Sequence, residues 1–158
     1  MLIRIDKNLT DELVDTATKS ERKRKNHNFH QTADDRLQRM LHAMNPGTYV
    51  QPHKHEDPDK REVFIVLTGS VYIILFTDDG SISEWMLLDS VSGNFGAEIP
   101  PRCWHTLIAL EQGTVVYEVK DGPYLPIDDK NFAPWAPAEG DTDCESYQAE
   151  LLHKILSE

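Results

Sequence analysis

Two histidines stand one residue apart in the segment PHKHEDPDKRE, which covers residues 52–62. Side chains two residues apart on an extended strand point to the same side, so His53 and His55 would project together. Two imidazoles on one face can chelate a metal ion, and Glu62, at the end of the segment, offers a carboxylate oxygen. The pattern predicts a hairpin across residues 56–61 that brings Glu62 back toward the histidines.

A fourth ligand is offered by His105, which follows a Pro-Pro turn in EIPPRCWHT and opens the apolar run TLIAL. It is therefore expected at the start of a strand that lines a barrel interior. Three histidine nitrogens and one carboxylate oxygen suit one divalent transition metal ion per chain, and Fe, Mn, Ni, Zn and Cu all remain open. The predicted metal ligands are His53, His55, Glu62 and His105.

The segments that must position these ligands alternate between apolar runs and short turns. Strands are predicted at 37–44 and 48–55, and further strands follow between 62 and 122. They arrive about every ten residues and no helical pattern separates them, which predicts antiparallel strands in a sandwich or barrel.

Helices are predicted near both ends of the sequence. Residues 8–20 repeat apolar side chains every four positions, with Asn8 or Thr10 as the cap. Near the other end, Thr142 and Glu145 form a capping-box pattern ahead of an apolar stripe. The chain before this second helix is rich in proline and aromatic residues and is expected to wrap the barrel surface.

The composition fits one globular domain, because 158 residues with 39% hydrophobic side chains can bury a sizeable core. A net charge of −11 repels phosphate groups and argues against nucleic acid as the main partner. No apolar stretch approaches the roughly 18 residues that span a bilayer, and the first residues lack the layout of a signal peptide. A cytoplasmic protein with no membrane partner is expected.

Other polar residues are candidates for binding a small molecule at the barrel mouth. An extended chain over RKRKNHNFH would align alternate polar side chains, and strand parity would place two more beside the metal-site histidines. The candidate substrate-binding residues are Asn26, Asn28, His30, Tyr49, Gln51 and Tyr124. His42 shares a strand face with Met40 and Met44, where a packed, hydrogen-bonded histidine is expected.

The order of these residues resembles the two-part signature of the cupin superfamily, reading Gly47, His53, His55, Glu62, Gly69, Pro100 and His105. The resemblance implies a single double-stranded β-helix (jelly-roll) barrel, mainly β, whose three histidines and one glutamate bind a metal inside. Cupins usually have three or four residues between the second histidine and the glutamate, whereas six stand here. Asp59 would fit that usual spacing, but Glu62 keeps the spacing to Gly69 and is preferred.

A longer resemblance, from about Arg24 to Pro137, is to the WbuC-type cupin-fold metalloproteins. The flanking stretches KNHNFH and FAPWAP carry it, together with the histidine motifs. Members of that family often occur with bacterial surface-polysaccharide (O-antigen) genes, and their reaction is not established. The resemblance therefore implies a metal-binding fold more than an activity.

We expect an N-terminal helix and basic arm over 1–36, a barrel over 37–122, and an extension with a C-terminal helix over 123–158. The predicted function is a metal-dependent enzyme that acts on a small polar molecule, such as a sugar or sugar derivative, and isomerisation or epimerisation would fit the site. Glu62 would hold the metal or act as a base. An Fe(II) oxygenase and a non-catalytic module that binds or senses a small molecule are the alternatives. A homodimer is expected, because an exposed edge strand favours pairing.

Overall fold

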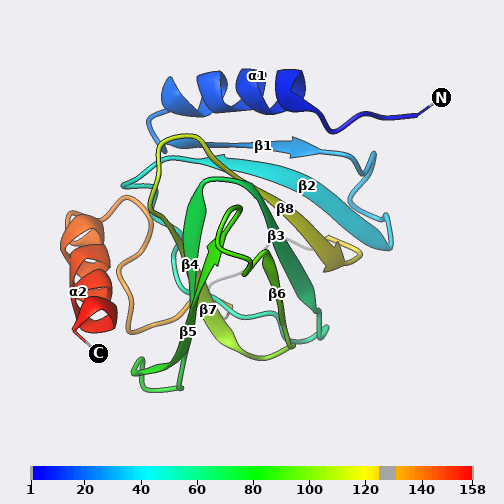
Figure 1. Ribbon diagram of the computed structural model, residues 1–158. Helices are drawn as coiled ribbons and strands as arrows, with labels where there is room; N and C mark the ends of the chain where they lie inside the picture. Colours follow the sequence, from blue (N-terminus) through cyan, green and yellow to red (C-terminus); the bar gives the residue numbers. More distant parts are fainter. Residues whose placement is uncertain (1, 125–130, 158) are drawn as a thin grey trace.

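The computed structural model describes residues 2–124 and 131–157, and its described strands form two antiparallel sheets (Figure 1). One sheet has the strand order β1-β2-β8-β3-β6 and the other the order β5-β4-β7. The bounds are β1 Arg24–Asn28, β2 Leu37–Met44, β3 Glu62–Thr68, β4 Ser70–Phe76, β5 Ile82–Asp89, β6 Gly96–Ile99, β7 Trp104–Ala109 and β8 Thr114–Asp121. A mainly β chain with a helix near each end agrees with the prediction from sequence.

The apolar core lies between the two sheets. It combines side chains of β3 and β8 with side chains of β4 and β7, among them Phe64, Val66, Ile73, Leu107 and Val116. Strand β4 is buried on both faces because Ile73 points into this core while Ile74 belongs to a second apolar cluster outside the barrel. Because successive side chains of a strand point to opposite faces, β4 contributes both to the core between the sheets and to the cluster outside the barrel.

Helix α1, Lys7–Thr18, covers the outer face of the larger sheet (Figure 1). Its cap is Asp6, whose side chain accepts a hydrogen bond of 3.1 Å from the backbone N–H of Leu9. The predicted caps, Asn8 and Thr10, are wrong because the helix begins before both residues. The apolar side of the helix packs on strands β2 and β8 through Leu13, Ala17, Leu41, Ala43 and Val115.

Helix α2, Cys144–Leu156, packs on the outer face of the smaller sheet through Leu151 and Ile155. The predicted capping box is wrong, because the N-cap is Asp143 and it makes no side-chain cap hydrogen bond. The hydroxyl of Thr142 lies 3.4 Å from the Asp143 carboxylate instead. Neither α1 nor α2 has the length and apolar character needed to cross a bilayer.

The strand predicted over residues 48–55 is wrong. Pro52 has no N–H to donate to a ladder, and pairing is limited to isolated bridges at His53. The backbone N–H of His53 donates to the carbonyl of His105 at 3.0 Å, and the N–H of Ala133 donates to the carbonyl of Pro52 at 2.9 Å. The segment is therefore held between β7 and the chain that follows the barrel. Residues 125–130 of the predicted Pro-rich extension lie outside the described residues.

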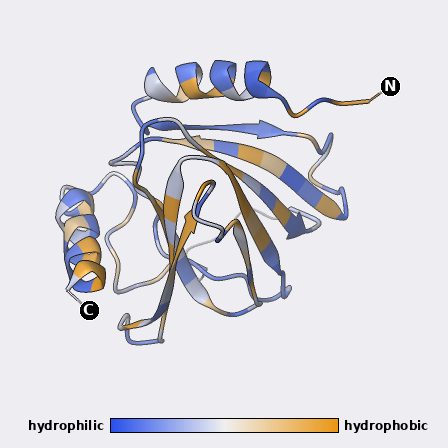
Figure 2. Ribbon diagram, viewed as in Figure 1, coloured by the Kyte–Doolittle hydropathy of each residue, from blue (hydrophilic) through white to orange (hydrophobic). Residues whose placement is uncertain are grey.

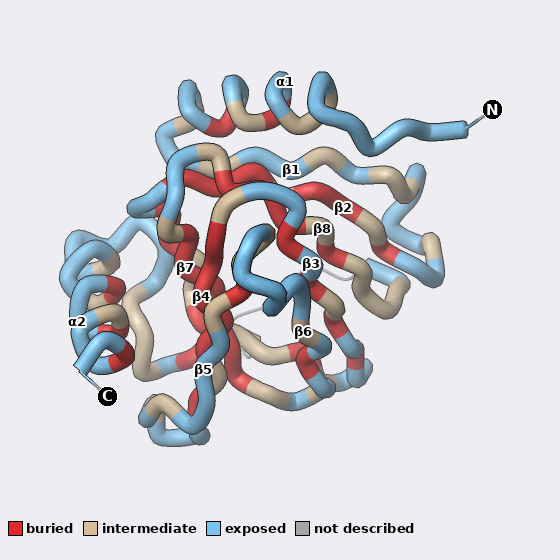
Figure 3. Tube along the Cα trace, in the orientation of Figure 1, coloured by how far each residue is buried: buried red, intermediate tan, exposed pale blue. Residues whose placement is uncertain are grey.

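Strand β1 is hydrophilic along its length (Figure 2) and largely exposed (Figure 3), as an edge strand paired only with β2 on one side. The larger sheet therefore includes residues 24–28, which the sequence-based division assigns to the N-terminal arm. Because β1 is a strand of this sheet, alternate side chains of residues 24–28 point toward the barrel interior.

Gly69, between β3 and β4, has a backbone φ of +74°, and a Cβ there would lie 2.5 Å from the hydroxyl of Thr114. Gly93 has a φ of +102° but no atom within 4 Å of the position of a Cβ. We expect Gly69→Ala to lower the free energy of unfolding by about 2–4 kcal/mol and Gly93→Ala by about 1 kcal/mol, from backbone strain alone. Urea unfolding of both variants measures this, and equal losses would contradict the steric argument.

Candidate metal centre

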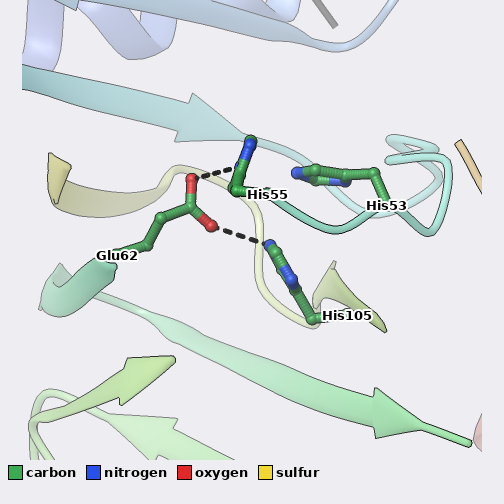
Figure 4. A group of neighbouring side chains, drawn as sticks. All are labelled: His53, His55, Glu62 and His105. Atoms are coloured by element: carbon green, nitrogen blue, oxygen red, sulfur yellow. Dashed lines mark ion pairs between the residues drawn. The ribbon is translucent and has the colours of Figure 1, made fainter. Parts of the chain in front are cut away.

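The four predicted ligands meet inside the barrel (Figure 4). Glu62 is the first residue of β3 and His105 the second residue of β7, while His53 and His55 come from the bridged segment before β3. One ligand atom from each residue lies within 4.8 Å of the others. His55, Glu62 and His105 are buried, and His53 is partly buried.

The Glu62 carboxylate lies between two imidazoles. Its Oε1 is 3.0 Å from Nε2 of His55, and its Oε2 is 2.8 Å from Nε2 of His105. Although these distances are short, both nitrogens and Oε2 lack a hydrogen-bond partner of acceptable geometry among the described residues. Buried polar atoms without partners are costly, and three of them converge here. A cation bound by these atoms would satisfy all three, so the residues present fit a metal site.

Backbone carbonyls orient two of the rings. Nδ1 of His53 lies 2.9 Å from the carbonyl of Gln51, and Nδ1 of His105 lies 2.9 Å from the carbonyl of Cys103. Because a carbonyl only accepts, Nδ1 must donate in both rings, which leaves the Nε2 lone pair of a neutral imidazole for the metal. The same arrangement is common around metal-ligating histidines.

The pKa shifts of His53 and Glu62 favour the protonation states that bind a metal. Burial, reinforced by the neighbouring charge of His105, lowers the pKa of His53 to about 3, so its imidazole is neutral. Burial alone would raise the pKa of Glu62, but His105 and the other neighbouring donors outweigh it and hold this pKa well below its usual value. Burial likewise opposes the charge on His105, yet Glu62 outweighs it and raises the pKa of His105. Without a metal, Glu62 and His105 therefore favour an ion pair.

The predicted hairpin between the histidines and Glu62 is wrong, since β3 pairs with β6 and β8 and not with residues 48–55. Glu62 nevertheless faces the histidines, from across the barrel. The alternative ligand Asp59 lies outside the cluster and is paired with Arg102 at 2.8 Å.

A chain of polar contacts extends from the buried Glu62 across the inner face of the larger sheet to the exposed Asn26. Nζ of Lys120 lies 3.1 Å from Glu62 Oε1 and 3.0 Å from Glu118 Oε1. The other oxygen of Glu118 is 2.6 Å from Nε2 of His42, whose Nδ1 is 2.8 Å from the side-chain oxygen of Asn26. Sequence reasoning missed Glu118 and Lys120, although their spacing of two in VYEVKDG places both on one strand face.

The charge of Glu118 is linked to stability. Burial raises its pKa, but Lys120 and His42 outweigh burial and lower it. A carboxyl whose folded-state pKa is depressed contributes stability above its unfolded pKa of about 4.3, and this stability is lost as the pH falls through the folded-state value.

We therefore expect the free energy of unfolding of the metal-free protein to fall below pH about 4.3, and to fall less steeply in Glu118→Gln. The difference in slope is at most one proton, about 1.4 kcal/mol per pH unit. Urea unfolding between pH 7 and pH 3 measures both slopes, and parallel curves would show that Glu118 does not contribute.

A cavity of about 660 Å³ lies beside the cluster, with His53 and Glu62 in its wall. Four of the six candidate substrate-binding residues line it, namely Asn26, Asn28, His30 and Tyr124. His42, Glu118 and Lys120 line the same cavity. The polar chain and the metal cluster thus face one space.

The predicted place of Tyr49 and Gln51 beside the metal site is wrong. The hydroxyl of Tyr49 donates to the carbonyl of Pro137 at 2.6 Å, and its ring meets Tyr147 of α2 edge to face. The side-chain oxygen of Gln51 accepts from the N–H of Glu139 at 3.3 Å. Both face the chain after the barrel, because a segment without a regular ladder does not keep strand parity.

Residues 5–88 match the model of a family described as Domain of unknown function (DUF6016), which is more than half of the 158 residues. The chain belongs to the DUF6016 family. The matched part of this DUF6016 chain contains His53, His55 and Glu62, and His105 lies beyond it. Among curated proteins, none matches the chain.

Solved structures similar to the DUF6016 chain include the capsular polysaccharide assembling protein CapF from Staphylococcus aureus, at 22% identity and a TM-score of 0.53, over 64% of this chain and 27% of CapF. TT1209 from Thermus thermophilus is 21% identical with a TM-score of 0.50, over 65% of this chain and 86% of TT1209. A cupin-2 domain containing protein from Shewanella frigidimarina is 18% identical with a TM-score of 0.47, over 62% of this chain and 80% of that protein.

These likenesses concern the fold. The DUF6016 chain spans only about a quarter of CapF, and its identity to each of these structures is low. Together with the two facing sheets, the likenesses to CapF and TT1209 confirm the predicted jelly-roll fold with a short helix near each end.

Proposed function

We propose that this protein is a WbuC-type cupin that binds one transition metal ion and acts as an enzyme on a small polar molecule, a sugar or sugar derivative. The observation that carries the proposal is the cluster of three histidines and one glutamate in the wall of a polar cavity. The link to bacterial surface-polysaccharide (O-antigen) biosynthesis is supported by the sequence resemblance alone.

His53, His55, Glu62 and His105 would hold the metal. When bound, the ion supplies Lewis acidity that polarises a carbonyl or hydroxyl oxygen of the substrate. This chemistry suits isomerisation or epimerisation next to a carbonyl group.

The cavity wall supports a ligand that carries hydroxyl groups. Gln38 is fully buried, and its amide nitrogen donates to the carbonyls of Ala33 and Asp35 at 3.2 and 2.7 Å. Its side-chain oxygen has no partner among the described residues, so a substrate hydroxyl could donate to it. Asn26 and Asn28 add further hydrogen-bonding groups in the same wall.

The test is turnover by the full chain loaded in turn with Mn, Fe(II), Ni or Zn. Free sugars and nucleotide sugars are incubated in D₂O, and NMR follows both new isomers and deuterium at carbons next to carbonyl groups. We expect conversion that requires metal and that disappears in the His53→Ala/His105→Ala variant.

Unchanged mixtures with every metal would contradict an isomerase or epimerase. Oxygen consumption by the Fe(II)-loaded protein would then favour the oxygenase. Sugar binding without turnover, measured by calorimetry, would favour the binding module.

A further inference from the structure

Glu62 is poorly placed to leave the metal and act as a base. It is 2% exposed, and its oxygens lie within 3.1 Å of His55, His105 and Lys120. A carboxylate with neighbours on every side has little freedom to swing toward a substrate. A reaction that moves a proton in this cavity therefore needs another group.

His42 is the imidazole in the cavity wall that a buried carboxylate holds in place. Its Nε2 lies 2.6 Å from Glu118, which is itself fixed by Lys120 at 3.0 Å. Because a carboxylate accepts, Nε2 carries a proton, and Nδ1 then has the lone pair in the neutral ring. The side-chain oxygen of Asn26, 2.8 Å from Nδ1, is also an acceptor, so the Asn26 amide must turn its NH₂ group toward Nδ1 when the ring is neutral. The group covering Nδ1 is the side chain of Asn26, which is exposed and lines the same cavity.

We propose that His42 is the proton-transfer residue of this cavity and that Glu118 is its positioning residue. The inference rests on the proposed function and adds the group that performs its acid–base step. A substrate that displaces the Asn26 amide brings its C–H next to Nδ1. Nδ1 takes the proton, the C–H electron pair forms the double bond of an enolate, and the negative charge moves to the carbonyl oxygen. The enolate oxygen takes the proton of the hydroxyl on the carbon that lost its C–H, and that hydroxyl oxygen becomes the new carbonyl. Nδ1 returns its proton to the former carbonyl carbon, so the aldose–ketose isomerisation balances without any redox partner.

Glu118 contributes by fixing the ring and by stabilising the imidazolium that forms, as a carboxylate does in other carboxylate–histidine pairs. Lys120 carries the opposite charge between the two carboxylates, so Glu118 remains charged although it is buried beside an anionic metal ligand. The metal cluster and the proton-transfer pair thus share one cation while they face one cavity.

The first test needs no substrate. In the metal-loaded full chain labelled with ¹⁵N-histidine, NMR at pH 8 reports which ring nitrogen of His42 carries a proton, with His42→Gln used to assign the signals. We expect protonation at Nε2 alone in the wild type, and a mixture of both tautomers in Glu118→Gln. A proton on Nδ1 alone, or a ring protonated at both nitrogens at pH 8, would overturn the proposal.

The second test is deuterium incorporation from D₂O into the sugar found to be converted. We expect His42→Gln to keep its metal content and sugar affinity but to lose incorporation by about 100-fold or more. Glu118→Gln should lower the rate at saturating sugar with little change in KM. The matched control is His27→Gln, whose ring packs on Phe29 in the same strand region and which does not line the described cavity.

Failure of the proposed function and failure of the role of His42 give different results. If no sugar is converted by the wild type, the proposed function fails, while the tautomer of His42 still decides whether a base is present. If conversion occurs and His42→Gln converts at the wild-type rate, the proposed function stands and the role of His42 is refuted.

Discussion

His105→Ala is expected to remove bound metal from the protein. The wild type should retain about one ion per chain after dialysis, and the variant close to none. The physical reason is that His105 is almost fully buried and its Nε2 points at the other ligands, so neither water nor a neighbouring side chain can readily replace it. Elemental analysis of the purified proteins measures the ratio.

The matched control for this experiment is His153→Ala, which removes an exposed histidine from α2. It should keep the wild-type metal content. Equal metal in His105→Ala and the wild type, or metal in neither after reloading, would refute the metal centre.

Lys120→Met is expected to cost the metal-free protein about 3–5 kcal/mol of unfolding free energy at pH 7. The substitution keeps most of the length of the side chain but removes the cation between Glu62 and Glu118, which are both buried. The negative charges of Glu62 and Glu118 would then be buried without the positive charge that pairs with both of them. The loss should shrink at pH 5, because the carboxyls of the variant take up protons more readily.

Arg61→Met is the control for Lys120→Met, since Arg61 pairs with Asp121 at the surface and is largely exposed. Its free energy of unfolding should stay close to that of the wild type, as expected for an exposed ion pair. Urea unfolding at pH 7 and pH 5 compares the variants. A loss in Lys120→Met no larger than in the control would show that the buried charges do not depend on Lys120.

The metal cluster could be anticipated from spacing, but not from the elements that carry it. His53 and His55 do face the same site, yet they lie in a bridged segment and not in a strand. Glu62 reaches them from across the barrel and not through a hairpin. The motif predicted the ligands because a metal site constrains where the ligand atoms lie. It did not predict the secondary structure, because many backbone paths can bring the ligand atoms to those positions.

The surroundings of the cluster were harder to predict, because they depend on long-range pairing. The side chains of Tyr49 and Gln51 would point to the same side as His53 only in a regular strand with a hydrogen-bonded ladder, and residues 48–52 form no such strand. Glu118 and Lys120 read as ordinary polar positions until β8 is placed between β2 and β3, where their inner face becomes buried. The burial of a charge is a property of neighbouring strands, which local sequence does not specify.

The bridged segment before β3 joins the metal centre to the part of the chain that follows the barrel. Lys54 donates its backbone N–H to Asn131, and Ala133 donates to Pro52, on either side of His53. Breaking these two hydrogen bonds would loosen His53 and His55, which are two of the four ligands, at the same time. Metal occupancy should therefore slow hydrogen exchange at these two amides. The ion would then stabilise the backbone around residues 131–133, although the described residues of the chain leading to α2 supply none of the clustered ligands.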